Sequence, residues 1–108
     1  MKIAAYSDLH LEFSNIFLQP KTDLVVLAGD IWTRDRAVQW ALNTFDCDVV
    51  YVLGNHERYG CNVSMLSGKI KDLAAGHPRL HVLDRDELVL PEHGVRILGC
   101  TLWTDFRL

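Results

Sequence analysis

Short runs of apolar residues without polar alternation recur in the first half of the chain. They cover residues 2–7, 24–28 and 49–53, and a polar residue or a glycine follows each run closely. This pattern is typical of strands covered on both faces, because none of their side chains has to point at water. It predicts a mostly parallel sheet.

Apolar residues at helical spacing lie between and after these runs. The first helix is predicted from four residues spaced i, i+3, i+4 and i+7: Val38, Ala41, Leu42 and Phe45. The second is predicted from five residues that share one helix face: Val63, Leu66, Ile70, Leu73 and Ala74. We expect Thr33 to cap the first helix, and we expect Gly76 and Pro78 to end the second.

The pattern changes after Pro78. Residues 80–83 predict a short strand, and residues 88–90 and 95–100 predict a hairpin joined by the turn at 91–94. The charged residues 84–87 are expected to form a solvated turn. The link at 11–23 is compatible with a short helix or a loop, and Pro20 favours a loop at its end. The fold class is therefore α/β, a mostly parallel sheet with flanking helices and an antiparallel or mixed addition.

Composition narrows the class of protein. The 108 residues suit one domain, and 49% of them are hydrophobic. A net charge of −3 does not favour nucleic acid as the default partner, although a local basic patch would be compatible with it. The three cysteines are odd in number and form no CxxC pair, so we expect free thiols rather than a zinc ribbon. No signal peptide or membrane span is evident, and a cytoplasmic location is expected.

Polar residues with metal-ligand chemistry follow all three apolar runs. They are Asp8 and His10 after the first, Asp30 after the second, and Asn55 and His56 after the third. In a parallel sheet these strand ends share one edge, where ligand sites gather. Each residue alone would suit turn chemistry, but together they predict a site for divalent metals such as manganese, iron or zinc. Two such ions would suit in-line displacement at phosphorus, with a hydroxide activated between them.

The motifs Asp8-Leu9-His10, Gly29-Asp30 and Gly54-Asn55-His56-Glu57 resemble the opening signature of the calcineurin-like metallophosphoesterases. Residues 99–106 also look like bacterial members of that family. The resemblance implies a layered sandwich of two sheets flanked by helices. It also implies metal-dependent hydrolysis of a phosphomonoester or phosphodiester by a two-metal-activated hydroxide.

The resemblance also implies a role for each motif residue. Asp8 and His10 would bind the first metal, Asp30 would bridge both metals, and Asn55 would bind the second. His56 would act on the leaving group or stabilise the transition state. Glu57 completes the motif without an assigned role. For the substrate phosphate, Asn55 is a candidate contact, and so are Arg58 and Tyr59 from their position just beyond the third motif, with a surface role as the equal alternative for these two.

Other parts of the family signature are not found. The further histidine and the GHxH motif that finish the family's site do not occur, since the remaining histidines, His77, His81 and His93, lie in no such motif. Residues 1–108 are therefore expected to be a truncated N-terminal portion of the family domain that binds at most one ion. A non-catalytic remnant is the alternative, unless another chain supplies the missing histidines. Such a portion would leave a sheet edge open for self-association.

The residues after Asp30 bear on the substrate class. Gly29-Asp30 continues into Ile31-Trp32-Thr33 rather than into the longer acidic and arginine motif of eukaryotic-type protein phosphatases, which disfavours a phosphoprotein substrate. Trp32 is expected in the core or its cover, with a cleft-lining position as the alternative.

Overall fold

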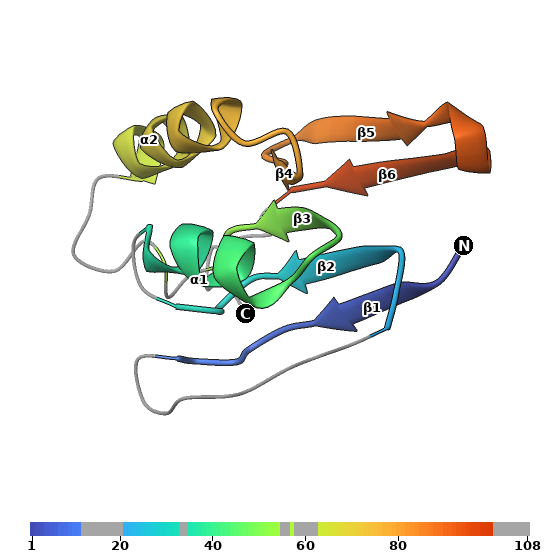
Figure 1. The fold of residues 1–108 in the computed structure, drawn as a ribbon. Helices are drawn as coiled ribbons and strands as arrows, with labels where there is room; N and C mark the ends of the chain where they lie inside the picture. The colour runs from blue at the N-terminus through green and yellow to red at the C-terminus, as the bar shows by residue number, and fades with distance from the viewer. Residues whose placement is uncertain (12–20, 33–34, 55–56, 58–62, 101–108) are drawn as a thin grey trace, which may run out of the picture.

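Six strands, two α-helices and a short 3-10 helix make up the regular structure of the part of the chain that the computed structural model describes, namely residues 1–11, 21–32, 35–54, 57 and 63–100 (Figure 1). In chain order the elements are β1 (Ile3–Tyr6), β2 (Leu24–Ala28), α1 (Arg36–Thr44), β3 (Asp48–Val52), α2 (Val63–Ala75), β4 (Leu80–Val82), β5 (Asp86–Leu90), η2 (Pro91–His93) and β6 (Val95–Gly99). No described helix is long and apolar enough to cross a membrane.

The first four strands form one parallel sheet in the order β1-β2-β3-β4. Leu24 pairs with Ile3 on one side and with Asp48 on the other, so the first residues of β1, β2 and β3 are in register. Because they run in the same direction, their carboxyl ends lie at one edge of the sheet (Figure 1). The α/β class and the parallel sheet predicted from the sequence are confirmed, and β4 proves to be a fourth parallel strand.

Each face of this sheet is covered by a different layer. Val25, Leu27, Val49 and Tyr51 belong to the apolar cluster that includes the buried side chains of α1 and α2. Their strand neighbours Leu24 and Val50 belong to a second cluster, which includes Leu90 and the partly buried residues of the β5–β6 hairpin. Both faces of β2 and β3 are covered, and this explains why apolar and polar residues do not alternate along these strands.

Val38, Ala41 and Phe45 are buried on the inner side of α1, as predicted, whereas Leu42 is only partly buried. Ala37, which the predicted spacing did not include, is buried as well. The helix begins at Arg36 with Asp35 in the N-cap position, so the prediction of Thr33 as the cap is wrong; Thr33 itself lies outside the described residues. Asp35 makes no side-chain capping hydrogen bond.

The C-terminal end of α1 is satisfied by an arginine from another element. The guanidinium of Arg79 donates hydrogen bonds to the carbonyls of Leu42, Phe45 and Cys47. Helix C-termini leave carbonyls without intrahelical partners, and Arg79 supplies donors to them from the segment just before β4.

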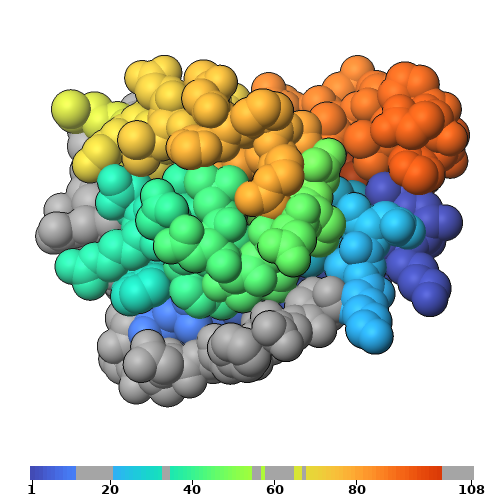
Figure 2. Space-filling model, in the orientation of Figure 1, coloured from blue at the N-terminus to red at the C-terminus, as the bar shows by residue number. Residues whose placement is uncertain are grey.

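Helix α2 packs against the same face through Leu66, Ile70 and Ala74, which are all buried. The expectation that Leu73 shares this face is wrong, because its side chain is 43% exposed. The buried residues are spaced four apart, so the contact stripe drifts around the helix and leaves Leu73 at its rim. The ammonium of Lys71 lies 2.5 Å from the Asp86 carboxylate, which places α2 beside the start of the hairpin (Figure 2).

The hairpin forms as predicted, with Leu90 opposite Val95 across the turn at Pro91–His93. Its first strand begins at Asp86 rather than 88, so the expectation of a solvated turn at 84–87 is wrong for half of that segment. The Arg96 Nε lies 2.5 Å from the Glu87 Oε2 across the hairpin. Both side chains are exposed, so this ion pair lies on the solvent-facing side of the hairpin.

Some large apolar side chains stay open to solvent. Ile3 on the edge strand β1 is 48% exposed, and Leu98 on β6 is 69% exposed. Self-association through an exposed sheet edge stays a prediction. The predictions for the link at 11–23 fall mainly on residues 12–20, outside the described residues.

Candidate metal centre

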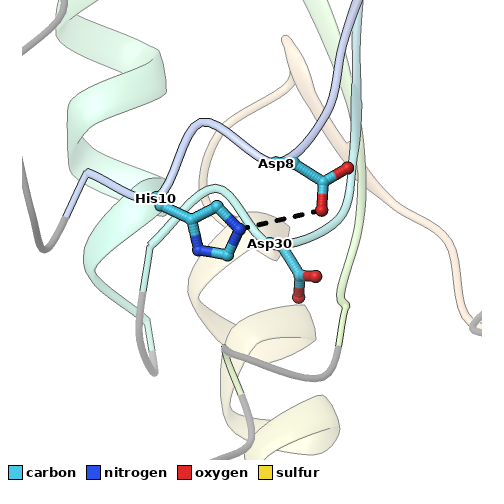
Figure 3. Close-up of side chains that lie close together, drawn as sticks. All are labelled: Asp8, His10 and Asp30. Carbon is cyan, nitrogen blue, oxygen red and sulfur yellow. Dashed lines mark ion pairs between the residues drawn. The ribbon is translucent and has the colours of Figure 1, made fainter.

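Three of the five predicted metal-site residues lie together where β1 and β2 end. Asp8 and His10 follow β1, and Asp30 follows β2. Their side chains point toward one another (Figure 3). One ligand atom from each residue can be chosen so that all three atoms lie within 4.8 Å of one another, and the His10 Nε2 lies 3.7 Å from the Asp8 Oδ1. The convergence expected from the parallel sheet is therefore present for these three residues.

All three residues have a left-handed backbone conformation. Their φ angles are 55° at Asp8, 47° at His10 and 53° at Asp30. Such angles cost a residue with a Cβ about 1–2 kcal/mol, and they gather at functional sites where the surrounding structure imposes them. This strain has no signal in the spacing of the sequence.

Hydrogen bonds between the two strand-end segments impose these conformations. The amide of Asp8 donates to the carbonyl of Gly29 over 3.0 Å, and the amide of His10 donates to the carbonyl of Asp30 over 3.0 Å. The amide of Leu11 continues the series to the carbonyl of Ile31 at 2.8 Å. These hydrogen bonds join the segments that follow β1 and β2, and the side chains of Asp8, His10 and Asp30 project from the joined segments.

The two motif glycines let a third segment approach. Gly29 has a φ of 86°, and a Cβ added to it would lie 3.1 Å from the backbone of Gly54. A Cβ on Gly54 would lie 2.5 Å from the amide nitrogen of Asp30 and would overlap its carboxylate. The end of β3 therefore packs directly on Asp30, and only glycine fits at position 54.

Glu57 joins the segments that follow β2 and β3 from below the surface. It is fully buried, and its carboxylate accepts hydrogen bonds from the amides of Asp30 (2.9 Å), Ile31 (3.0 Å) and Gly54 (3.0 Å). The hydroxyl of Tyr51 donates a fourth bond over 2.7 Å. From the sequence, Glu57 was recognised only as the last residue of a motif, without a role. An acid placed three residues after a strand-ending glycine was the available signal, but spacing alone did not show that it faces inward.

The donor set of the cluster fits a divalent cation. Two carboxylates and one imidazole are hard and borderline ligands that suit manganese, iron or zinc. The Asp8 side chain is 64% exposed and the His10 side chain 27% exposed, so the cluster opens to solvent on the Asp8 side. Three protein ligands on one ion leave coordination positions for water or a substrate oxygen.

The other candidates divide into two groups. Asn55, His56, Arg58 and Tyr59 lie outside the described residues, so their roles stay predictions. Trp32 packs against the helix-side core, and its indole nitrogen is buried without a hydrogen-bond partner among the described residues, which agrees with a core or cover position.

The histidines outside the motifs do not join the cluster. His77 and His93 are exposed, and His81 lies on β4 with its Nε2 3.5 Å from the Asp48 carboxylate at the start of β3. In a parallel sheet the start of β3 is at the edge away from the strand ends that carry Asp8 and Asp30, so His81 belongs to the opposite side of the molecule.

Comparison with protein families agrees with this geometry. The model of the calcineurin-like phosphoesterase family matches residues 1–105, a range that includes every strand end described above. Neither the curated proteins nor the solved structures compared with the chain gave a match. The matched range, together with an α/β fold whose strand ends converge on carboxylate and imidazole ligands, shows that the chain belongs to the calcineurin-like phosphoesterase family.

Proposed function

We propose that the chain carries the metal-binding half of a phosphoester hydrolase site and that it acts on phosphomonoesters or phosphodiesters. The convergence of Asp8, His10 and Asp30 carries this proposal. Family membership supplies the reaction class, and the donor set supplies the requirement for a divalent cation, with manganese, iron and zinc as the candidates.

Asp8, His10 and Asp30 are proposed to hold one ion in this chain; in a complete family site Asp30 would also face a second ion together with Asn55. Bound divalent cations supply Lewis-acid stabilisation of phosphoryl oxygens and lower the pKa of water. The protein's own part is to hold these ligands at the strand ends, where Asp30 is locked against Gly54. Backbone hydrogen bonds between the strand ends hold Asp8, His10 and Asp30 in their left-handed conformations.

His56 is proposed to donate a proton to the leaving group. In hydrolysis a water oxygen forms a bond to phosphorus, the bond from phosphorus to the leaving oxygen breaks, and the leaving oxygen takes a proton. An imidazole can supply that proton because it titrates near neutral pH. His56 lies in the sequence between Gly54 and Glu57, which both contact the Asp30 segment. Arg58 and Asn55 are proposed to contact the substrate phosphate.

The alternative proposal is a non-catalytic chain that binds at most one divalent ion. It is favoured by the described ligand group, which comprises three residues and so accounts for one ion. Under this proposal Asp30 binds metal, but no ester turns over. A cytoplasmic location and an N-terminal portion of a longer family domain stay predictions under both proposals.

Two measurements test these proposals: the first separates them, and the second tests the metal site that both require. The first is hydrolysis of an aryl phosphate and of its bis-ester with Mn²⁺ added. His56→Ala is expected to lower the rate by about 10²–10⁴-fold if the histidine is the general acid. Rates equal to buffer for both substrates, in the unmodified chain, would reject the hydrolase proposal in favour of the alternative.

The second measurement is Mn²⁺ binding by titration calorimetry. Asp30→Ala is expected to abolish binding, whereas Asp72→Ala, which removes an exposed carboxylate on α2, is the matched control and is expected to leave binding unchanged. We expect at most one ion per chain. Two tightly held ions would contradict that expectation, and unchanged binding in Asp30→Ala would reject the metal site itself.

A further inference from the structure

Glu57 is the one charged side chain that is fully buried among the described residues, at 0% exposure. A buried carboxylate is costly unless its oxygens are hydrogen-bonded. Here each oxygen accepts two bonds. One oxygen serves the amides of Asp30 and Gly54, and the other serves the amide of Ile31 and the hydroxyl of Tyr51. Glu57 therefore fills its acceptor capacity with donors from the ends of two neighbouring strands.

Two of these donors bracket Asp30, one of the three proposed ligands. The amide of Asp30 lies on one side of its Cα, and the amide of Ile31 lies on the other. Fixing both amides fixes the backbone of Asp30 between them, and that backbone has the unfavourable φ of 53°. Glu57 thus makes the two bonds that most directly oppose relaxation of Asp30 to an ordinary conformation.

The same peptide groups pass the constraint on to His10. The peptide unit between Asp30 and Ile31 donates its N–H to Glu57 and accepts the His10 amide through its carbonyl. Hydrogen bonds that share one peptide unit polarise and strengthen each other. A single buried carboxylate is therefore connected directly to Asp30 and, through one shared peptide unit, to His10 on the neighbouring strand end.

We propose that Glu57 is a positioning residue of the metal centre. Its carboxylate holds Asp30 in the left-handed conformation, and through the peptide unit that follows Asp30 it holds His10, so that the ligands are placed before an ion binds. The proposal rests on the proposed function for the identity of the cluster as an ion site. The placement of the backbone does not depend on that function and can be measured without metal.

Glu57→Gln tests this role with almost no change in shape. The amide has one acceptor oxygen and one NH₂ donor, so one of the two oxygen positions turns from acceptor to donor. The Tyr51 hydroxyl can reverse its bond, but the amide of Ile31 at the same oxygen cannot. At the other oxygen, both donors are backbone amides. Either orientation of the glutamine therefore leaves at least one strand-end amide without its acceptor.

Tyr51→Phe is the matched control, because it removes one hydrogen bond to the same carboxylate and leaves all three backbone amides paired. Two readouts are compared in both variants. One is the Mn²⁺ dissociation constant by calorimetry, and the other is amide hydrogen exchange at His10 and Leu11 in the metal-free chain. We expect Glu57→Gln to weaken Mn²⁺ binding about 10–100-fold, as loss of a ligand-orienting partner does. We expect exchange at His10 and Leu11 to quicken about tenfold. Tyr51→Phe is expected to change neither.

The outcomes separate this proposal from the function on which it rests. If the unmodified chain binds Mn²⁺ and Glu57→Gln binds it equally well with unchanged exchange, the positioning role is rejected and the metal site stands. If the unmodified chain binds no Mn²⁺, the proposed function fails, and exchange at His10 and Leu11 in the two variants still decides the positioning role. If Glu57→Gln does not fold, exchange in the unmodified chain decides it. Protected amides at Asp30 and Ile31 support the role, and amides exchanging as in an unfolded chain overturn it.

Discussion

Gly54→Ala is the sharpest test of the packing between strand ends, because position 54 has no room for a side chain. An added Cβ would lie 2.5 Å from the amide nitrogen of Asp30 and would overlap the Asp30 carboxylate. The first obstacle is backbone, which cannot rotate away as the tip of a long side chain can. The variant must therefore shift either the end of β3 or Asp30 itself. Either shift also stretches the 3.0 Å bond from the Gly54 amide to Glu57.

The expected magnitude follows from that overlap. Forcing one extra carbon into a well-packed site costs about 1–3 kcal/mol. For a chain of about this size, each kcal/mol lowers Tm by about 4–8 °C. Because the shift moves Asp30 relative to Asp8 and His10, Mn²⁺ binding should weaken about tenfold or more. Loss of stability and loss of affinity should appear together.

Gly68→Ala is the control, since it adds the same methyl group in open space. Gly68 lies within α2, is exposed, and would have no atom within 4 Å of an added Cβ. Replacing glycine by alanine inside a helix stabilises by about 0.5–1 kcal/mol, so Tm should rise while Mn²⁺ affinity stays constant. Thermal unfolding by circular dichroism and titration calorimetry measure both quantities. A Gly54→Ala chain with unchanged Tm and unchanged affinity would refute the packing argument.

Three further predictions concern the rest of the fold. Ile70→Ala, at a fully buried position of α2, should cost about 2–5 kcal/mol of unfolding free energy in urea titrations, and a cost below 1 kcal/mol would contradict the assigned core. The hydrogen bond from Lys71 lowers the pKa of Asp86, so the pair should stabilise the fold above the ordinary carboxyl pKa of about 4 and lose that effect as pH falls through the lowered pKa of the folded state. A Lys71–Asp86 double-mutant cycle should therefore give a coupling free energy of about 0.5 kcal/mol at pH 7 and none at pH 2. Partial burial raises the pKa of the Cys47 thiol, so in single-cysteine variants the exposed Cys100 should react with a disulfide reagent faster at pH 8 than Cys47 does. Equal rates would contradict the partial burial of Cys47.

The parallel sheet could be predicted because its signal is local. Residues 24–28 form a continuous apolar run, and the same five residues form β2. A strand covered on both faces needs apolar side chains throughout, so this pattern appears whichever elements of the chain provide the covering layers. The convergence of Asp8 and Asp30 follows from the same fact, since parallel strands bring their carboxyl ends to one edge.

Other features depended on contacts distant in the sequence. Leu73 has the spacing of a buried residue, yet the buried stripe of α2 runs through Leu66, Ile70 and Ala74 and leaves it exposed. The start of α1 at Arg36 likewise could not be read from Thr33, because capping residues are common in sequences that do not use them. Asp86 reads as a turn residue, but pairing with β6 draws it into a strand.

The metal centre shows most clearly where sequence reasoning stops. The motif residues were predicted as ligands from their chemistry, but the feature that brings their side chains together is a set of backbone hydrogen bonds. Asp8, His10 and Asp30 all have conformations that an isolated chain would avoid, and each is held by an amide or carbonyl of a neighbouring strand end. Glu57 matters in this arrangement because it accepts amides from the β2 and β3 ends at once. A site organised in this way should respond to changes that leave every ligand intact, so its affinity for a cation is a property of the joined strand ends as much as of the side chains that touch the ion.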